Sequence, residues 1–203
     1  MDFNGAQSLV ATLRQTVSAA GGNTAISVNT AQSLSVSELA GLMQLAGGKQ
    51  LSLSFNGAQS HLGILQPVVN ASTGNSSVSM NTSQTWGDAD LLALVRAATS
   101  KALSLDFNGA QTLATTLRQL ISVAGASTAI SVNTAQAMPS ADLVSLMQLA
   151  AAKALSLAFN GAQSDSTTIQ AVASVAGAGT SIGVNTAQVV PTASLVALAR
   201  AAG

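Results

Sequence analysis

The run Leu51-Ser52-Leu53-Ser54-Phe55-Asn56-Gly57-Ala58-Gln59 contains two signals that recur along the chain. Apolar residues and serines alternate over its first half, which is typical of a strand that buries one face. An Asn-x-Ala-Gln signature then closes the run. After such signatures, apolar residues follow at helical spacing, as at Leu39, Leu42 and Met43. Each unit is therefore predicted to contain a strand, a turn and a short helix; Pro67 is expected to shorten or kink the third helix.

The Asn-x-(Ala/Ser)-Gln signature occurs eight times, and this repetition sets the domain organisation. The distance between successive asparagines alternates between 25 and 27 residues, so two units form a period of 52 residues. We predict one repeat domain over residues 1–203. Its units are approximately 1–24, 25–50, 51–76, 77–102, 103–128, 129–154, 155–180 and 181–203.

Strands and helices that alternate in one direction give parallel strands with helical crossovers. Two architectures satisfy this pattern. One is a right-handed α/β solenoid of eight strand–helix units, with a parallel sheet on one face and short helices on the other. The alternative is a closed (β/α)8 barrel, whose strands are buried on both faces. Rows of serine would fill a barrel interior poorly, so the alternation favours the solenoid.

The odd-numbered units resemble the leucine-rich repeat core L-x-L-x-x-N. The resemblance is carried by Leu51, Leu53 and Asn56, and again by the run Leu103–Asn108. It covers the strand half of these units, whereas the even units depart from it. The resemblance implies a right-handed α/β solenoid with an asparagine ladder.

The signature asparagines are interpreted as structural. An amide side chain supplies donors and an acceptor to backbone groups that lose their partners where a strand ends. We therefore predict that these residues bridge neighbouring turns as a ladder. Its members are Asn4, Asn29, Asn56, Asn81, Asn108, Asn133, Asn160 and Asn185.

The strand face that points away from the helices is the candidate binding face. It comprises Ser27, Ser52, Ser54, Ser79, Ser104, Asp106, Ser131 and Ser156. Lys49, Lys101 and Lys153 recur every 52 residues and are interpreted as solvated cations near helix C-termini. His61 is the single histidine and the chain has no cysteine, so we predict no metal site. No catalytic or cofactor-binding residue is predicted.

Composition restricts the partners. Seven basic residues balance seven acidic ones, and only 7% of residues are charged. Little charge repulsion opposes self-association, and no basic patch is available for nucleic acid. No apolar run is long enough to span a membrane, and the N-terminus shows no signal-peptide pattern. A soluble protein is predicted, with no compartment assigned.

The first functional hypothesis is a non-catalytic structural or protein-interaction scaffold that binds another protein or copies of itself. Both ends lack a polar capping unit, which suggests a piece of a longer array or head-to-tail assembly. The alternative is a polysaccharide- or polymer-binding module that uses the serine face, although aromatic residues make up only 2% of the chain. A barrel enzyme is disfavoured because near-identical turns offer no distinct acid and base.

Overall fold

The computed structural model describes residues 1–6, 9–185, 187 and 190–201, within which strands and helices alternate. The strands are β1 (Asp2–Asn4), β2 (Ile26–Asn29), β3 (Leu51–Asn56), β4 (Ser77–Asn81), β5 (Ala102–Asn108), β6 (Thr128–Asn133), β7 (Ala154–Asn160) and β8 (Thr180–Asn185). The helices are α1 (Val10–Ala19), α2 (Val36–Ala46), α3 (Leu62–Ala71), α4 (Asp88–Ala97), α5 (Ala114–Val123), α6 (Ser140–Leu149), α7 (Ser166–Ala173) and α8 (Thr192–Ala201).

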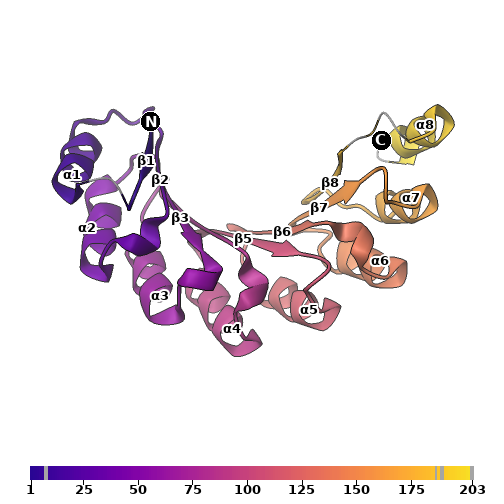
Figure 1. Cartoon of the computed structure of the whole chain (residues 1–203), viewed down its shortest axis with the longest axis horizontal. Coiled ribbons are helices and arrows are strands. Elements are labelled where there is room, and N and C mark those ends of the chain that lie inside the picture. Colours follow the sequence, from indigo (N-terminus) through magenta and orange to yellow (C-terminus); the bar gives the residue numbers. More distant parts are fainter. Residues whose placement is uncertain (7–8, 186, 188–189, 202–203) are drawn as a thin grey trace.

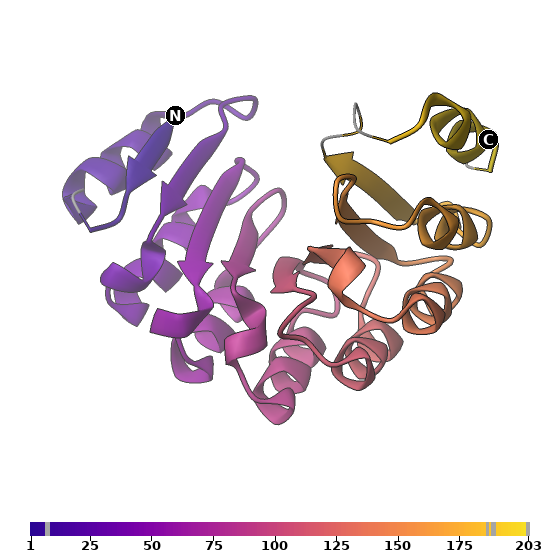
Figure 2. The same ribbon diagram turned by 45° about the vertical axis from the view of Figure 1, so that its right-hand side comes forward.

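All eight described strands are parallel and are hydrogen-bonded in chain order from β1 to β8. The sheet curves, with strands on the inner side of an arc and helices on the outer side (Figure 1). The turned view in Figure 2 shows the same layers, with α1 and α8 at opposite ends of the arc. The prediction of an α/β fold with eight parallel strands joined by helices is confirmed.

The core is one apolar layer between the sheet and the helices. In β3, Leu51, Leu53 and Phe55 are fully buried, whereas the serines between them are half-buried on the other face. Phe107 and Phe159 repeat the position of Phe55 at intervals of 52 residues and are equally buried. Burying each such side chain contributes roughly 1.5–3 kcal/mol to folding. The period-two alternation therefore determines which face of the sheet the helices cover.

The helices begin and end by local rules, with one departure from expectation. Helix α2 starts with a capping box, in which the Ser35 side chain accepts from the backbone of Glu38 and the Glu38 carboxylate accepts from the backbone of Ser35. Helix α3 continues through Pro67 for ten residues, as long as α4 and α5, so of the predicted shortening or kink the shortening does not occur. Apolar residues of α3 that are buried on both sides of Pro67 offset the hydrogen bond that proline cannot donate.

The recurring lysines connect successive units. The Nζ atom of Lys49 donates to the carbonyl oxygens of Val17 and Ser18 at 2.6 and 2.7 Å. Lys153 Nζ repeats this contact at Ile121 and Ser122, at 2.5 and 3.0 Å. Each ammonium group caps the C-terminal end of the helix in the preceding unit, where the helix dipole favours positive charge. The lysines therefore bind backbone carbonyls in place of the solvated position that we predicted.

The turn after each strand differs between odd and even units. Thr30, Thr82 and Thr134 in the even units have left-handed backbone angles, with φ between 50° and 53°. The odd units have glycine at the equivalent position because the neighbouring turn approaches closely. A Cβ atom on Gly57 would lie 2.8 Å from the carbonyl oxygen of Thr82. The 52-residue pair of units is therefore the structural period as well as the sequence period.

Candidate ligand-binding face

The residues predicted as a binding face lie on the sheet face opposite the helices, in three staggered rows. All seven strand pairs have a register of 25 residues, whereas the units alternate between 25 and 27, so each double repeat shifts the rows by two residues. The first row is Asp2, Ser27, Ser52 and Ser77; the second is Ser54, Ser79 and Ser104; the third is Asp106, Ser131, Ser156 and Ser181. The structure brings the predicted residues together on one face, but not in a single line.

Most hydroxyl groups on this face have no partner within the protein. Ser54 and Ser79 bond to each other at 2.9 Å, and Ser131 bonds to Asp106. Among the described residues, the hydroxyls of the other predicted serines make no hydrogen bond to the protein; these are Ser27, Ser52, Ser104 and Ser156. All four are half-buried and remain open to solvent. They can therefore donate to, or accept from, a ligand without breaking a contact of the fold.

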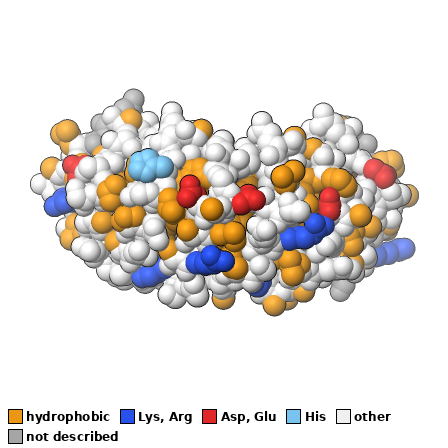
Figure 3. Space-filling view, turned by 90° about the horizontal axis from the view of Figure 1, so that it is seen from below, with side chains coloured by type: hydrophobic (Ala, Val, Ile, Leu, Met, Phe, Trp, Pro, Cys, Tyr) orange, Lys and Arg blue, Asp and Glu red, His pale blue; other side chains and the backbone are white. Residues whose placement is uncertain are grey.

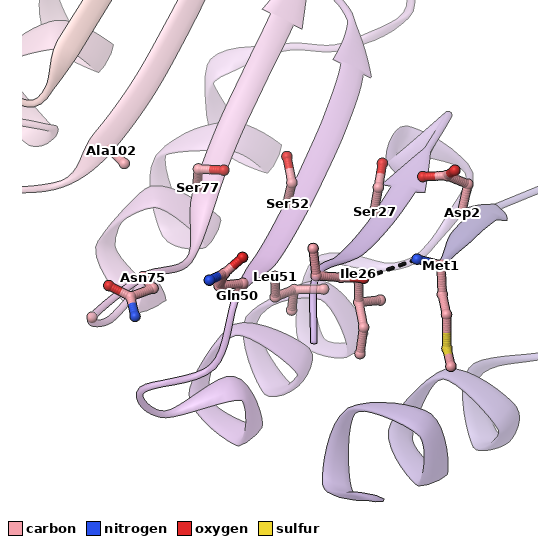
Figure 4. A pocket seen from close by; sticks show the side chains of 12 residues that line it. Met1, Asp2, Ile26, Ser27, Gln50, Leu51, Ser52, Asn75, Ser77 and Ala102 are labelled. Atoms are coloured by element: carbon pink, nitrogen blue, oxygen red, sulfur yellow. Dashed lines mark hydrogen bonds between the residues drawn. The ribbon is translucent and has the colours of Figure 1, made fainter. Parts of the chain in front are cut away.

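A cleft of about 600 Å³ lies near the N-terminal ends of β1 to β5. Its polar lining comprises Asp2, Ser27, Gln50, Ser52, Asn75 and Ser77. Figure 4 shows Ser27, Ser52 and Ser77 in a row on successive strands, with the Ser27 and Ser52 side chains pointing the same way and that of Ser77 turned aside. At the edge of the cleft, the amino group of Met1 donates to the carbonyl oxygen of Ala25 at 2.9 Å. Regularly spaced hydroxyls over several strands suit an extended ligand better than a compact one.

Asp106 is the charged residue in the third row. Burial raises the pKa of its carboxyl above the ordinary value, and the hydrogen bond from Ser131 partly counteracts that rise. Ser131 follows Asp106 in the strand register, on β6. This carboxylate can accept two hydrogen bonds from vicinal hydroxyl groups of a ligand.

The signature asparagines form four register pairs, namely Asn4 with Asn29, Asn56 with Asn81, Asn108 with Asn133, and Asn160 with Asn185. In the odd units the amide oxygen serves the turn. Asn108 Oδ1 accepts from the backbone of Ala110 at 3.0 Å and from the hydroxyl of Thr134 at 2.7 Å. Between an even unit and the next odd unit, a glutamine makes the connecting hydrogen bond: Gln84 Oε1 accepts from the backbone of Asn108 at 3.1 Å.

Sequence reasoning missed part of this site. Ser77 has the same parity as Ser79 on β4, so extending the alternation by two residues would have found it. Gln50 and Asn75 lie in loops just before strands, where no periodic signal marks them. Only the curvature of the sheet and the packing of neighbouring units bring these loop amides to the same cleft as the serines.

The helical face has a different character. Figure 3 looks onto it, and acidic and basic side chains are interspersed there with apolar ones. The one ion pair among the described residues joins Arg118 to Asp142 at 2.5 Å, between α5 and α6. None of the described helices is long and apolar enough to cross a bilayer. This surface shows no single-sign field that would recruit a polyanion.

Comparison with known proteins supports the fold and leaves the family open. No protein-family model matches the sequence, and no curated protein matches it significantly. Among solved structures, the leucine-rich repeat-containing protein LegL7 from Legionella pneumophila matches all of this chain and 70% of its own length, with a TM-score of 0.75 at 15% identity. The likeness shows a repeat-like α/β fold.

Other matches are to enzymes. The 3-hexulose-6-phosphate synthase from Salmonella typhimurium matches 99% of this chain and 97% of its own length, with a TM-score of 0.45 at 14% identity. The aldolase QR15 matches 89% and 87%, with a TM-score of 0.44 at 9% identity.

These matches correct the expectation of a non-catalytic scaffold. A synthase, an aldolase and a 2,3-dimethylmalate lyase all match most of this chain, so both the scaffold function and the exclusion of catalysis are overturned. The physical reason is that catalytic residues of α/β folds lie on the loops at the strand ends. The absence of a known sequence motif therefore does not exclude catalysis. With TM-scores below 0.5, these structures assign no reaction or residue to this chain.

Proposed function

We propose that the chain is an open α/β solenoid that binds an extended, uncharged polysaccharide along its serine face. The observation that carries this proposal is the set of half-buried hydroxyls without protein partners, which line the 600 Å³ cleft and continue beyond it. The strand order from β1 to β8 supports the open form, because the described pairings include none between the first and last strands. In a closed barrel these serines would face a sealed interior.

The charge pattern of the face favours a neutral ligand. It carries Asp2 and Asp106 and no basic residue, and the ammonium groups of the recurring lysines are turned toward backbone carbonyls. An anionic polymer would meet these carboxylates, with no lysine or arginine side chain among the described residues of the face to compensate them. Hydroxyl groups of a neutral glycan can instead pair with serine hydroxyls and amides, each acting as donor and acceptor.

The face has no aromatic platform, so each sugar contributes little and affinity must come from many contacts. A net hydrogen bond contributes only about 0.5–1.5 kcal/mol. A short oligosaccharide should therefore bind weakly, and affinity should rise steeply with chain length as further rows become engaged.

A glycan array of neutral polysaccharides, followed by calorimetric titration with oligomers of increasing length, tests this function. The variant Ser27→Ala/Ser52→Ala/Ser77→Ala should lose most of the binding. The matched control, Ser18→Ala/Ser122→Ala/Ser174→Ala, changes two exposed helical serines and the exposed serine that directly follows α7, and should bind like wild type. Failure of the wild-type chain to bind any neutral glycan, or equal binding by both variants, would overturn the proposal.

A further inference from the structure

Strand β8 and helix α8 leave positions uncovered that the other even units bury. Val184 of β8 is half-buried and Ala199 of α8 is exposed. The equivalent side chains in the second, fourth and sixth units are fully buried; they are Val28, Met80 and Val132 on the strands and Met43, Val95 and Met147 on the helices. In those units the strand of the following odd unit pairs alongside. Among the described residues no strand pairs with the outer edge of β8, so this side remains open.

The opposite edge of the sheet, at β1, leaves the complementary side of an odd unit open. Phe3 and Thr16 are half-buried. Their equivalents in the later odd units are fully buried and apolar; they are Phe55, Phe107 and Phe159 on the strands and Val68, Leu120 and Val172 on the helices. A hollow of about 360 Å³ lies at this edge, and Phe3, Thr16 and Ala20 belong to its lining. This hollow occupies the side of an odd unit that the preceding even unit covers inside the stack.

The two open edges are the two halves of an interface that occurs three times within the chain. An even unit is followed by an odd unit at β2–β3, β4–β5 and β6–β7. In the register of β4 and β5, Met80 lies beside Leu105. Val184 lies 104 residues after Met80, and Met1 lies 104 residues before Leu105. A second copy that placed its Met1 beside Val184 would therefore continue both the strand register and the alternation of units.

The two edges do not cover each other within one molecule, because β1 and β8 lie toward opposite ends of the arc (Figure 1). Each is a strand edge whose outer backbone groups can pair with another strand. The chain has seven acidic and seven basic residues, so its net charge is zero and little electrostatic repulsion opposes contact between copies. The surface that fits each edge best is the other edge of the same chain.

We infer that the β8–α8 edge of one copy binds the β1–α1 edge of a second copy, head to tail. The contact repeats the even-to-odd interface of the stack, with α8 packed against α1 of the neighbour. It joins two different surfaces, so a dimer still has one free edge of each kind and adds further copies unless a ring closes. This assembly does not depend on the ligand proposed above.

Sedimentation equilibrium over a concentration series tests the assembly. The wild-type chain should move from the monomer mass of 20.0 kDa at about 1 µM to more than twice that mass at about 1 mM. A wild-type chain that stays monomeric over the whole series would overturn the inference.

Two charge substitutions block one edge each. Ala199→Glu places a carboxylate on the α8 edge, and Thr16→Glu places one on the α1 edge. The matched controls are Ala193→Glu and Gln15→Glu, on the same two helices, at positions that are exposed in every even and every odd unit respectively. Each blocking variant alone should stay at the monomer mass, whereas both controls should assemble like wild type. Circular dichroism and urea midpoints verify that all four variants are folded.

A mixture of the two blocking variants gives the sharpest result. Ala199→Glu retains an intact α1 edge and Thr16→Glu retains an intact α8 edge, so an equimolar mixture should form a dimer and nothing larger. A mixture that remains monomeric would rule out head-to-tail contact between these edges. Blocking variants that assemble alone as wild type does would place the contact elsewhere on the molecule and overturn the inference as well.

Discussion

At the scale of single residues, the left-handed threonines show how the fold balances strain against hydrogen bonds. A β-branched residue at φ near 50° costs about 1–2 kcal/mol. The Thr134 hydroxyl offsets that cost, because it contacts Asn108 Oδ1 at 2.7 Å and the Asn133 carbonyl at 2.6 Å. The strain is tolerated because the same side chain joins two units.

Two substitutions separate these effects. Thr134→Val keeps the strain and removes the hydrogen bonds, so we expect a loss of about 1–3 kcal/mol in unfolding free energy. Thr134→Gly removes the same hydrogen bonds and also releases the strain, so its unfolding free energy should lie between those of the valine variant and wild type. Urea denaturation of the three proteins checks the order. A glycine variant less stable than the valine variant would contradict the balance.

Asp106 gives the serine face a pH dependence of stability. Because burial raises its folded-state pKa above the unfolded value, the folded chain binds more protons over the acidic range between the two. Unfolding free energy therefore falls as pH rises through that range. Asp106→Asn should raise the urea midpoint at neutral pH and flatten this dependence. Asp2→Asn, on the edge strand, is the matched control. An equal rise of the urea midpoint in both variants would show that burial of Asp106 is not the cause of its effect.

At the scale of elements, the lysines that cap neighbouring helices contribute to the contact between units. Lys153→Met keeps the apolar stem and removes the ammonium group, so the Ile121 and Ser122 carbonyls lose their donor. We expect a loss of about 1 kcal/mol. Lys101→Met should cost less, because Lys101 contacts a single carbonyl, that of Ser72. Unfolding midpoints unchanged from wild type would show that the caps contribute nothing.

The elements also show how far sequence reasoning extends. The alternation at 51–56 predicted β3 and its buried face, because period-two patterning is a local signal. The spacing of Leu39, Leu42 and Met43 did the same for α2. The staggering of the serine rows was not predicted, because it arises from a register of 25 residues imposed on units of unequal length. The side chains of Asn29 and Asn133, which make no hydrogen bond within the described residues, were not distinguished from those of Asn56 and Asn108. The amide oxygens of Asn56 and Asn108 accept from the backbone two residues further on and from a threonine of the next unit.

At the scale of the whole molecule, the helices and strands pack mainly against their sequence neighbours. The open stack proposed above should tolerate loss of a complete period. Deleting residues 53–104 joins Ser52 to Leu105, which is the equivalent of Leu53. We expect a folded chain with a shorter arc and lower stability, measurable by circular dichroism and small-angle scattering. A closed barrel would lose its closure, so an unfolded deletion product would contradict the open architecture.

The closeness of successive turns also has a chemical consequence. In a flexible chain, the backbone nitrogen of the glycine in an Asn-Gly pair attacks the side-chain amide carbon of the asparagine. The attack expels ammonia and forms a cyclic imide, which hydrolyses to aspartate or isoaspartate. Here the nitrogens of Gly5 and Gly109 donate to Asn29 and Asn133 carbonyls at 2.7 and 2.8 Å, which holds each nitrogen away from that attack. The rate of spontaneous deamidation at each Asn-Gly pair should therefore increase with the frequency at which the turn around it opens. Deamidation rates measured during storage would then report local unfolding turn by turn.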